Sequence, residues 1–122
     1  MATVVIVDDN TCSCQFLERL LGIEGHTAVC LSGGAGLIET LKNMKPDLLL
    51  LDVMMPGMSG IDLLGMVRAV PALEYLPVVM LTGVMDLEIQ SQAFKLGATD
   101  YIVKDFDWEK SLGRIEQHLR KN

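Results

Sequence analysis

The chain has 122 residues, which is enough for one compact domain with a sizeable core but too few for two ordinary domains. Half of its residues are hydrophobic and 21% are charged, which is typical of a globular protein and excludes a disordered chain. The net charge of −6 argues against direct binding of nucleic acid, and no apolar run approaches the length that crosses a membrane.

The opening residues, MATVVIV, lack a basic flank and run directly into Asp8 and Asp9, which indicates a strand rather than a signal peptide. Three cysteines without a secretion signal point to a reducing compartment, so we expect a cytoplasmic protein. Because no second Cys or His pair lies nearby to complete a zinc site, we expect Cys12, Cys14 and Cys30 to fill helix and core positions.

Five short apolar runs have the composition of buried strands. They cover residues 3–8, 27–31, 47–52, 78–82 and 100–103. The segments between and after them carry apolar residues at helical spacing. In chain order these are Phe16, Leu17, Leu20 and Leu21; Leu37, Ile38, Leu41 and Met44; Leu63, Leu64 and Val67; Ile89, Ala93 and Phe94; and Trp108, Leu112, Ile115 and Leu119. We expect the first helix to end at Gly22, the third to begin at Ser59 and the fourth to be capped by Asp86.

Strict alternation of strands and helices predicts an α/β fold, a doubly wound parallel sheet of five strands with helices on both faces. We expect residues 1–122 to form a single domain. Ligands of such sheets bind at the carboxyl ends of the strands. The first strand ends in Asp8 and Asp9, the third in Asp52 and the fourth in Thr82, and Lys104 follows the fifth. The sequence therefore predicts one polar site at this edge.

The residue types at this edge suit phosphoryl transfer. Three neighbouring carboxylates repel one another unless a cation joins them, and magnesium prefers such oxygen ligands. Lys104 offers a positive charge and Thr82 a hydroxyl to phosphate oxygens, and Gly83 leaves room for the group to approach. Asp52 is then the candidate nucleophile, because positioning and neutralisation of charge are what phosphoryl transfer requires.

Several short motifs, spread over essentially the whole chain, together resemble one family. They are Val7-Asp8-Asp9, Asp52 with Met55-Pro56-Gly57 and Gly60, Leu81-Thr82-Gly83, and Gly97-Ala98 leading to Asp100-Tyr101 and Lys104. The chain resembles a response-regulator receiver domain of the chemotaxis-regulator type, from two-component signalling systems. The resemblance implies a flavodoxin-like sheet with the strand order 2-1-3-4-5.

The resemblance also implies the chemistry. Asp52 would accept a phosphoryl group from a phosphohistidine on a sensor histidine kinase or a histidine phosphotransfer protein. Asp9 and Asp52 would ligate Mg²⁺ directly, Asp8 through water, and Met54 through its backbone carbonyl. Such a domain is not an enzyme toward other substrates, because it catalyses only its own phosphorylation and slow dephosphorylation.

Thr82 and Tyr101 would form the switch of the domain. As Thr82 turns toward the phosphoryl group, the Tyr101 ring swings inward and reshapes the face made by the fourth helix, fifth strand and fifth helix. A downstream effector domain or protein would read that face. The residues that tune hydrolysis in this family are here Met54 and Val84, whose apolar side chains cannot orient water, so we expect a long-lived phosphorylated form.

One departure from the family pattern is Asp105, which stands where the family usually has a proline in a cis peptide. A trans bond is the default here, because a cis bond before another residue costs about 3 kcal/mol. We expect a weaker switch or a different partner face. Asp105 is also the feature that favours an alternative, a pseudo-receiver that acts as a phosphorylation-independent interaction module.

Two rival functions share parts of these patterns. A flavodoxin-like electron carrier would bind its flavin phosphate after the first strand, where this chain has two carboxylates. A haloacid-dehalogenase-type phosphatase needs an acid two residues after the nucleophile, where this chain has Met54. His26 and His118 lack a spacing that suggests ligation or base catalysis, and we expect both at the surface.

Overall fold

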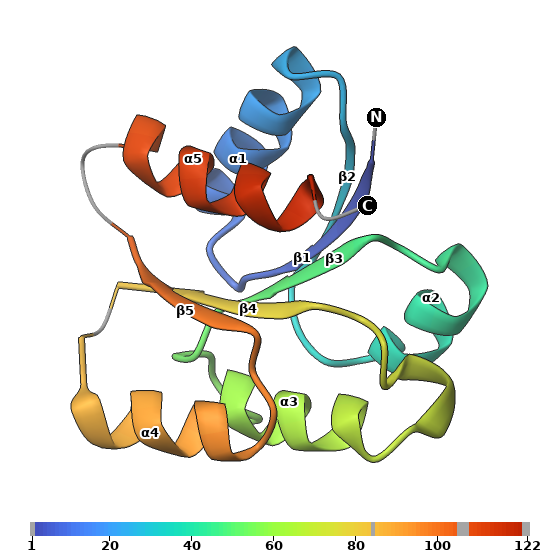
Figure 1. Ribbon diagram of the computed structural model, residues 1–122, viewed down its shortest axis with the longest axis vertical. Helices are drawn as coiled ribbons and strands as arrows, with labels where there is room; N and C mark the ends of the chain where they lie inside the picture. The colour runs from blue at the N-terminus through green and yellow to red at the C-terminus, as the bar shows by residue number, and fades with distance from the viewer. Residues whose placement is uncertain (1, 84, 105–107, 121–122) are drawn as a thin grey trace.

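The computed structural model describes residues 2–83, 85–104 and 108–120, which fold around one parallel sheet. In chain order the elements are β1 (Thr3–Val7), α1 (Thr11–Ile23), β2 (Thr27–Leu31), α2 (Leu37–Met44), β3 (Leu48–Leu51), α3 (Gly60–Arg68), the 3-10 helix η1 (Pro71–Leu73), β4 (Val78–Thr82), α4 (Leu87–Lys95), β5 (Asp100–Val103) and α5 (Trp108–Leu119). The strands lie in the order β2-β1-β3-β4-β5 (Figure 1). The predicted fold class and strand order are confirmed.

Helices cover both faces of the sheet, with α1 and α5 on one face and α2, α3 and α4 on the other (Figure 1). Successive residues of a strand point to opposite faces, so Val4 and Ile6 join the core beneath α1 and α5, whereas Val5 and Val7 join the core beneath α2 to α4. All four residues of β3 are buried. Burial on both faces explains why the strands read as uninterrupted apolar runs.

The predicted strand bounds are correct for β2, β4 and β5 and slightly long for the other two. β1 ends at Val7 and β3 at Leu51, so Asp8 and Asp52 lie one residue beyond the strands. The backbone of Asp52 still follows the sheet, because its N–H donates to the Val7 carbonyl at 2.9 Å. The core strands therefore hold both acids rigidly at the edge.

Two details of the helices differ from the prediction. α1 continues through Gly22 to Ile23, and the left-handed turn comes at Gly25, whose φ is 89°. Phe16 and Phe94 are each 43% exposed rather than buried. On α1 the buried residues repeat at Cys14, Leu17 and Leu21, which leaves Phe16 at the margin of the stripe, where its ring meets Trp108 edge to face at 5.2 Å.

Cys14 lies in the core and Cys30 packs against it, as expected, but the sequence did not predict that the two are bonded to each other. Cys14 of α1 and Cys30 of β2 are joined by a disulfide, and their Cα atoms are 6.0 Å apart. Cys14 lies on the buried face of α1, which packs directly against β2. Cys12 is exposed and has a free thiol.

The histidines are also more enclosed than expected. His26 Nε2 lies 3.0 Å from Glu116 Oε1, and His118 Nε2 lies 2.9 Å from Asp100 Oδ2. The side chains of His26 and His118 are only 10% and 13% exposed. Both pairs attach α5 to the sheet layer, a role that sequence spacing does not reveal because the partners are far apart in the chain.

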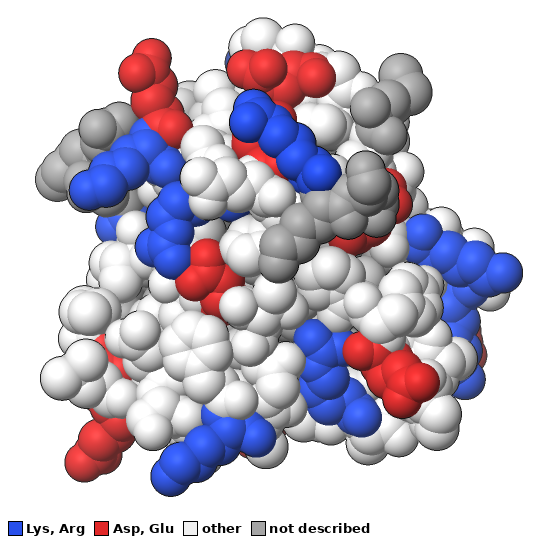
Figure 2. Space-filling view, in the orientation of Figure 1, with Lys and Arg blue, Asp and Glu red and all other residues white. Residues whose placement is uncertain are grey.

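Charges of both signs are interspersed over the molecular face drawn in Figure 2, which has the orientation of Figure 1. The net charge of −6 is therefore not gathered into one patch on this face. Within the described residues, no helix combines the length and apolar character needed to cross a membrane.

Candidate functional site

The register of the sheet brings the predicted site residues to one edge. Val7 of β1 lies opposite Leu51 of β3, so the residues that follow them, Asp8 and Asp52, are neighbours. At the other side of the site, Thr82 closes β4, and the Lys104 N–H donates to the Thr82 carbonyl at 2.6 Å. Segments far apart in sequence thus meet because parallel strands end together.

Three carboxylates converge at this edge. One oxygen from each of Asp8, Asp9 and Asp52 lies within 4.8 Å of the others. Asp8 and Asp52 are 3% and 9% exposed, whereas Asp9 is exposed to solvent. Hard divalent cations take such oxygen ligands, and magnesium commonly keeps several waters beside one or two carboxylates. The donor set fits Mg²⁺, with Asp9 on the side that water can reach.

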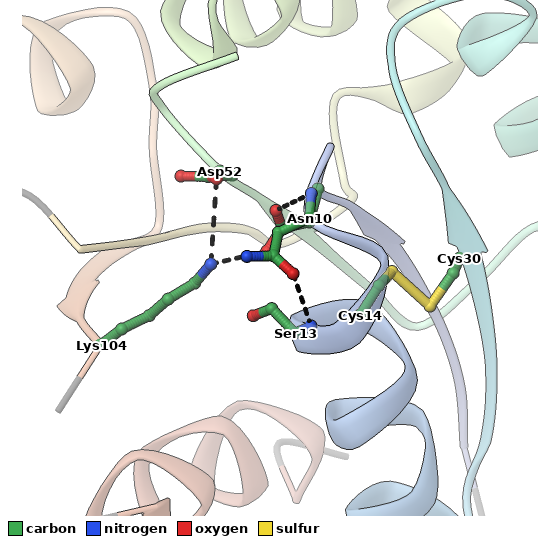
Figure 3. Close-up of polar contacts among 7 residues, drawn as sticks. Asn10, Ser13, Cys14, Cys30, Asp52 and Lys104 are labelled. Carbon is green, nitrogen blue, oxygen red and sulfur yellow. Dashed lines mark hydrogen bonds and ion pairs between the residues drawn. A yellow bond between two sulfur atoms is a disulfide. The ribbon is translucent and has the colours of Figure 1, made fainter. Parts of the chain in front are cut away.

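Lys104 reaches into this cluster from the end of β5 (Figure 3). Its Nζ lies 2.6 Å from Asp8 Oδ2 and 3.8 Å from Asp52 Oδ2. The ammonium therefore makes its direct contact with Asp8 and stands within electrostatic range of Asp52. This placement offsets part of the repulsion between the two acids.

The pKa of Asp52 is raised above its ordinary value of 3.8, chiefly because burial removes water from the carboxylate. Lys104 opposes this effect, the negative charge of Asp8 adds to it, and a hydrogen bond with the Thr82 side chain works against it. Added positive charge nearby stabilises the ionised form of a carboxylate that burial makes costly to ionise. A cation held by these acids would therefore favour the ionised, nucleophilic form of Asp52.

Thr82 lies beside Asp52, and Gly83 follows Thr82 in the chain. Thr82 is fully buried, so packing holds its hydroxyl in place near the acid. A Cβ added to Gly83 would meet no atom within 4 Å. The end of β4 thus supplies a hydroxyl to the site, and the residue after it leaves open space.

Asn10 supports the site and was missed in the sequence. Its N–H donates to Asp8 Oδ1 at 2.9 Å, and its Oδ1 accepts from the Ser13 N–H at 3.0 Å (Figure 3). Asn10 is therefore the N-cap of α1, which leaves Asp8 and Asp9 available for the site. An asparagine directly before a helical pattern was the available signal.

Gly60 has a steric role that the family motif alone did not explain. The Ser59 side chain caps α3 by accepting from the Asp62 N–H at 3.3 Å, and the Gly60 N–H donates to the Val53 carbonyl at 3.0 Å. A Cβ at Gly60 would clash with the backbone carbonyl of Asp52. The start of α3 can therefore press against the backbone of Asp52 only where a side chain is absent.

Met54 and Tyr101, the other two predicted site residues, differ in burial. The Met54 side chain is 60% exposed in the loop after β3, whereas Tyr101 is 4% exposed and belongs to the core beneath α2 to α4. Burial, with the negative charges of Asp86 and Asp52, raises the pKa of the Tyr101 phenol. Val84 and Asp105, which the sequence also singled out, lie outside the described residues.

Comparison with known proteins gives a consistent match. The family model described as the response regulator receiver domain matches residues 4–116. The chain is 34% identical over 119 residues to the DNA-binding response regulator MtrA of Mycobacterium tuberculosis (strain H37Rv), covering 98% of this chain and 51% of MtrA. It is 36% identical over 116 residues to the DNA-binding transcriptional regulator NtrC of Escherichia coli K12, covering 95% of this chain and 24% of NtrC. The chain thus spans about half of MtrA and a quarter of NtrC.

Solved structures agree with this match. The BeF3-activated N-terminal receiver domain of RstA from Klebsiella pneumoniae superposes with a TM-score of 0.87 at 30% identity, covering 98% of this chain and 99% of that one. The chemotaxis protein CheY4 of Vibrio cholerae superposes with a TM-score of 0.88 at 27% identity, covering 96% and 98% of the two chains.

Proposed function

This chain belongs to the family of response regulator receiver domains, which act in two-component systems, and we propose that Asp52 is its phosphoryl acceptor. One observation carries the proposal. Oxygens of Asp8, Asp9 and Asp52 lie within 4.8 Å of one another, and the Lys104 ammonium stands 3.8 Å from Asp52. Acids this close need a compensating charge, and phosphoryl transfer needs the same charges to neutralise its transition state.

In the proposed reaction an Oδ atom of Asp52 attacks the phosphorus of a phosphohistidine on a sensor histidine kinase or a histidine phosphotransfer protein. The new P–O bond forms as the P–N bond to the imidazole breaks, and the imidazole nitrogen leaves with the electron pair of that bond. The partner therefore regains its histidine, and this domain gains a mixed acyl phosphate. Lys104 and the Thr82 hydroxyl receive the phosphoryl oxygens.

Asp9 and Asp52 would hold Mg²⁺ directly, with Asp8 acting through water and the Met54 carbonyl completing the protein ligands. The bound ion would supply positive charge to the phosphoryl oxygens and favour ionised Asp52. Asp8 is held by Lys104 and by the Asn10 N–H, which suits a residue that orients a water rather than one that must move to the ion.

The output would depend on Thr82 and Tyr101. We expect the Thr82 hydroxyl to turn toward the phosphoryl group and the Tyr101 ring, which is already 4% exposed, to swing further inward, so that the face of α4, β5 and α5 changes. A downstream effector domain or protein would bind this face. With apolar Met54 and Val84 at the hydrolysis-tuning positions, the acyl phosphate should be long-lived.

We place the domain, residues 1–122, in the cytoplasm, without direct contact with nucleic acid or membrane. The pseudo-receiver alternative rested on Asp105 alone, and the complete set of acids with Lys104 and Thr82 favours a working phosphoacceptor.

Labelling with a phosphoryl donor tests the function. Wild type and Asp52→Ala are incubated with acetyl phosphate or a phosphorylated kinase, with Mg²⁺ and with a chelator, and incorporated phosphate is measured. We expect label on wild type only, and only with Mg²⁺. Label that survives Asp52→Ala would overturn the assignment, and an unlabelled wild type with every donor would favour the pseudo-receiver. Val84→Asn should shorten the lifetime of the label.

A further inference from the structure

We propose that Cys14 and Cys30 form a redox-controlled thiol site that regulates how tightly the neighbouring carboxylates bind a divalent cation. The bond joins the buried face of α1 to β2, at the edge strand of the sheet (Figure 3). The inference rests on the proposed function in its last step, cation binding, and on the proposed cytoplasmic setting, whereas the thiol chemistry stands on its own.

The disulfide closes a ring of contacts around Asp8. The Asp8 carboxylate accepts from the Asn10 N–H at 2.9 Å, and Asn10 caps α1, which carries Cys14. The disulfide then leads to Cys30, and the carbonyl of the next residue, Leu31, accepts from the Asp8 N–H at 3.0 Å. Both the side chain and the backbone of Asp8 are therefore held by segments that the disulfide ties together.

The sulfurs and the acid also share one cavity. A surface cavity of about 470 Å³ is lined by Asp8, Thr11, Cys14, Cys30 and Ser32, among others. Cys30 is half-buried, whereas Cys14 is 3% exposed. Cys30 is the more exposed residue of the pair and lines this cavity, so we assign its sulfur as the one that a small thiol attacks.

The exchange balances as an ordinary two-electron thiol–disulfide reaction. A thiolate of a glutathione-class or dithiol reductant attacks Cys30 Sγ, the Cys14–Cys30 bond breaks, and Cys14 leaves as a thiolate that takes up a proton. A second thiol of the reductant releases Cys30, so that the protein gains two electrons and two protons and the reductant becomes a disulfide. The disulfide form of the same reagent class reverses the step.

Disulfides in a compartment that keeps thiols reduced are usually transient or redox-sensing rather than structural. We therefore expect the Cys14–Cys30 bond to form and break reversibly there. In the oxidised form the ring around Asp8 is closed and its carboxylate is held beside Asp52. In the reduced form α1 and β2 are held together by packing and by the short connection at residues 24–26 with its hydrogen bonds, but no longer by a bond near Asp8. Part of the entropic cost of ordering the cation site is then met when the cation binds. The oxidised form should therefore bind the cation more tightly.

The first test reads the thiols directly. Protein equilibrated with oxidised glutathione, or with a phosphine reductant, is alkylated and analysed by peptide mass spectrometry. With both samples denatured before alkylation, we expect Cys14 and Cys30 to be recovered as a disulfide-linked peptide pair in the oxidised sample, with exposed Cys12 alkylated or carrying glutathione. All three cysteines should be alkylated in the reduced sample. Alkylation of both Cys14 and Cys30 in the oxidised sample would overturn the proposal.

The second test measures Mg²⁺ binding by calorimetry in both states. We expect the dissociation constant to rise about 3- to 10-fold on reduction, the range of a modest loss of preorganisation. Cys12→Ser, which leaves the pair intact, should keep this difference. Cys30→Ala, and the double variant Cys14→Ser with Cys30→Ser, should lose it and bind like the reduced wild type, with circular dichroism checking that each is folded.

Equal affinities of oxidised and reduced wild type would contradict the proposal even if the bond forms. The outcome is separable from that of the phosphoacceptor proposal. A redox-dependent Mg²⁺ affinity without phosphate label on Asp52 would support the thiol site and contradict the phosphoryl transfer. Phosphate label on Asp52 without redox dependence of Mg²⁺ binding would support the phosphoryl transfer and contradict the thiol site.

Discussion

Lys104 Nζ contacts Asp8 Oδ2 at 2.6 Å and stands farther from the proposed acceptor, 3.8 Å from Asp52 Oδ2. The lysine thus occupies the position of a counter-ion between two acids. A divalent cation and this ammonium compete for the same negative charge, whereas a phosphoryl group on Asp52 would bring a new acceptor for Lys104. Removal of the Lys104 charge should therefore strengthen cation binding and slow the phosphorylation of Asp52.

Replacement of this lysine separates cation binding from phosphorylation. We expect Lys104→Met to bind Mg²⁺ about 2- to 10-fold more tightly, because a positive charge within 4 Å of two carboxylates has been removed. Phosphorylation of Asp52 should slow by about 10²-fold or more, the usual cost of losing one charge-stabilising donor. Calorimetry and labelling rates measure the two effects.

Lys95→Gln is the matched control for that experiment, because Lys95 is an exposed lysine at the end of α4. Lys95→Gln should leave the Mg²⁺ affinity and the rate of phosphorylation unchanged. Loss of Mg²⁺ affinity in Lys104→Met would mean that the lysine supports the cation site rather than competing with it.

Gly60 offers a steric test of the loop that contains Asp52. In Gly60→Ala the new Cβ would clash with the Asp52 carbonyl, so the loop or the start of α3 must shift. We expect the free energy of unfolding to fall by about 1–3 kcal/mol, as for other overpacked sites, and phosphorylation to slow. Urea denaturation and labelling measure these changes.

Gly65 in the same helix provides the control, since an added Cβ there meets no atom within 4 Å. Gly65→Ala should be neutral or stabilising by up to about 1 kcal/mol, because alanine is the better helix former. Equal losses in the two variants would show that the helix, and not the contact with Asp52, is sensitive.

The raised pKa of Asp52 predicts that the acid costs stability at neutral pH. The folded state holds the Asp52 proton more tightly than the unfolded chain does, so stability falls as the pH rises from 3.8 through the raised pKa. Asp52→Asn should therefore stabilise the protein at pH 7, by about 0.5–2 kcal/mol. The gain should disappear below pH 3.8, where both side chains are neutral.

Denaturation of the Asp52 variant at several pH values checks this prediction. Glu74→Gln, at an exposed position, removes one negative charge without burial and should change stability little. A stabilisation of Asp52→Asn that is the same at every pH would point to packing rather than to the carboxylate charge.

The carboxylate of Asp100, unlike that of Asp52, stabilises the folded protein at neutral pH. Burial raises its pKa, but hydrogen bonds from His118, the Tyr101 N–H and Arg114 outweigh this, and the net pKa is lowered from 3.8. A lowered pKa contributes stability above the unfolded value, and that stability is lost as the pH falls through the folded pKa. Asp100→Asn should cost about 1–3 kcal/mol at pH 7, since charged hydrogen bonds are lost.

The pH dependence of that cost is the discriminating measurement. The difference between Asp100→Asn and wild type should shrink as the pH drops below 3.8, because the wild-type carboxyl becomes neutral as well. A difference that stays constant down to strongly acidic pH would contradict an electrostatic origin.

Local patterns in the sequence determined the layout of this protein. The apolar run Leu48–Leu51 predicts a strand buried on both faces, and the alternation with helices predicts parallel pairing, because each crossover needs a helix. Parallel strands end at a common edge, so Asp8, Asp52 and Thr82 could be assigned to one site before any distance was known. The strand order came only through the resemblance to a family.

The tertiary structure decided which of these groups touch. The contact of Lys104 with Asp8, the disulfide between Cys14 and Cys30, and the close approach of Gly60 to the Asp52 carbonyl join segments that no local pattern relates. Periodicity reports which side of an element is buried. Register and side-chain rotamers determine which distant atoms then meet, and both are set by the packing of the whole core.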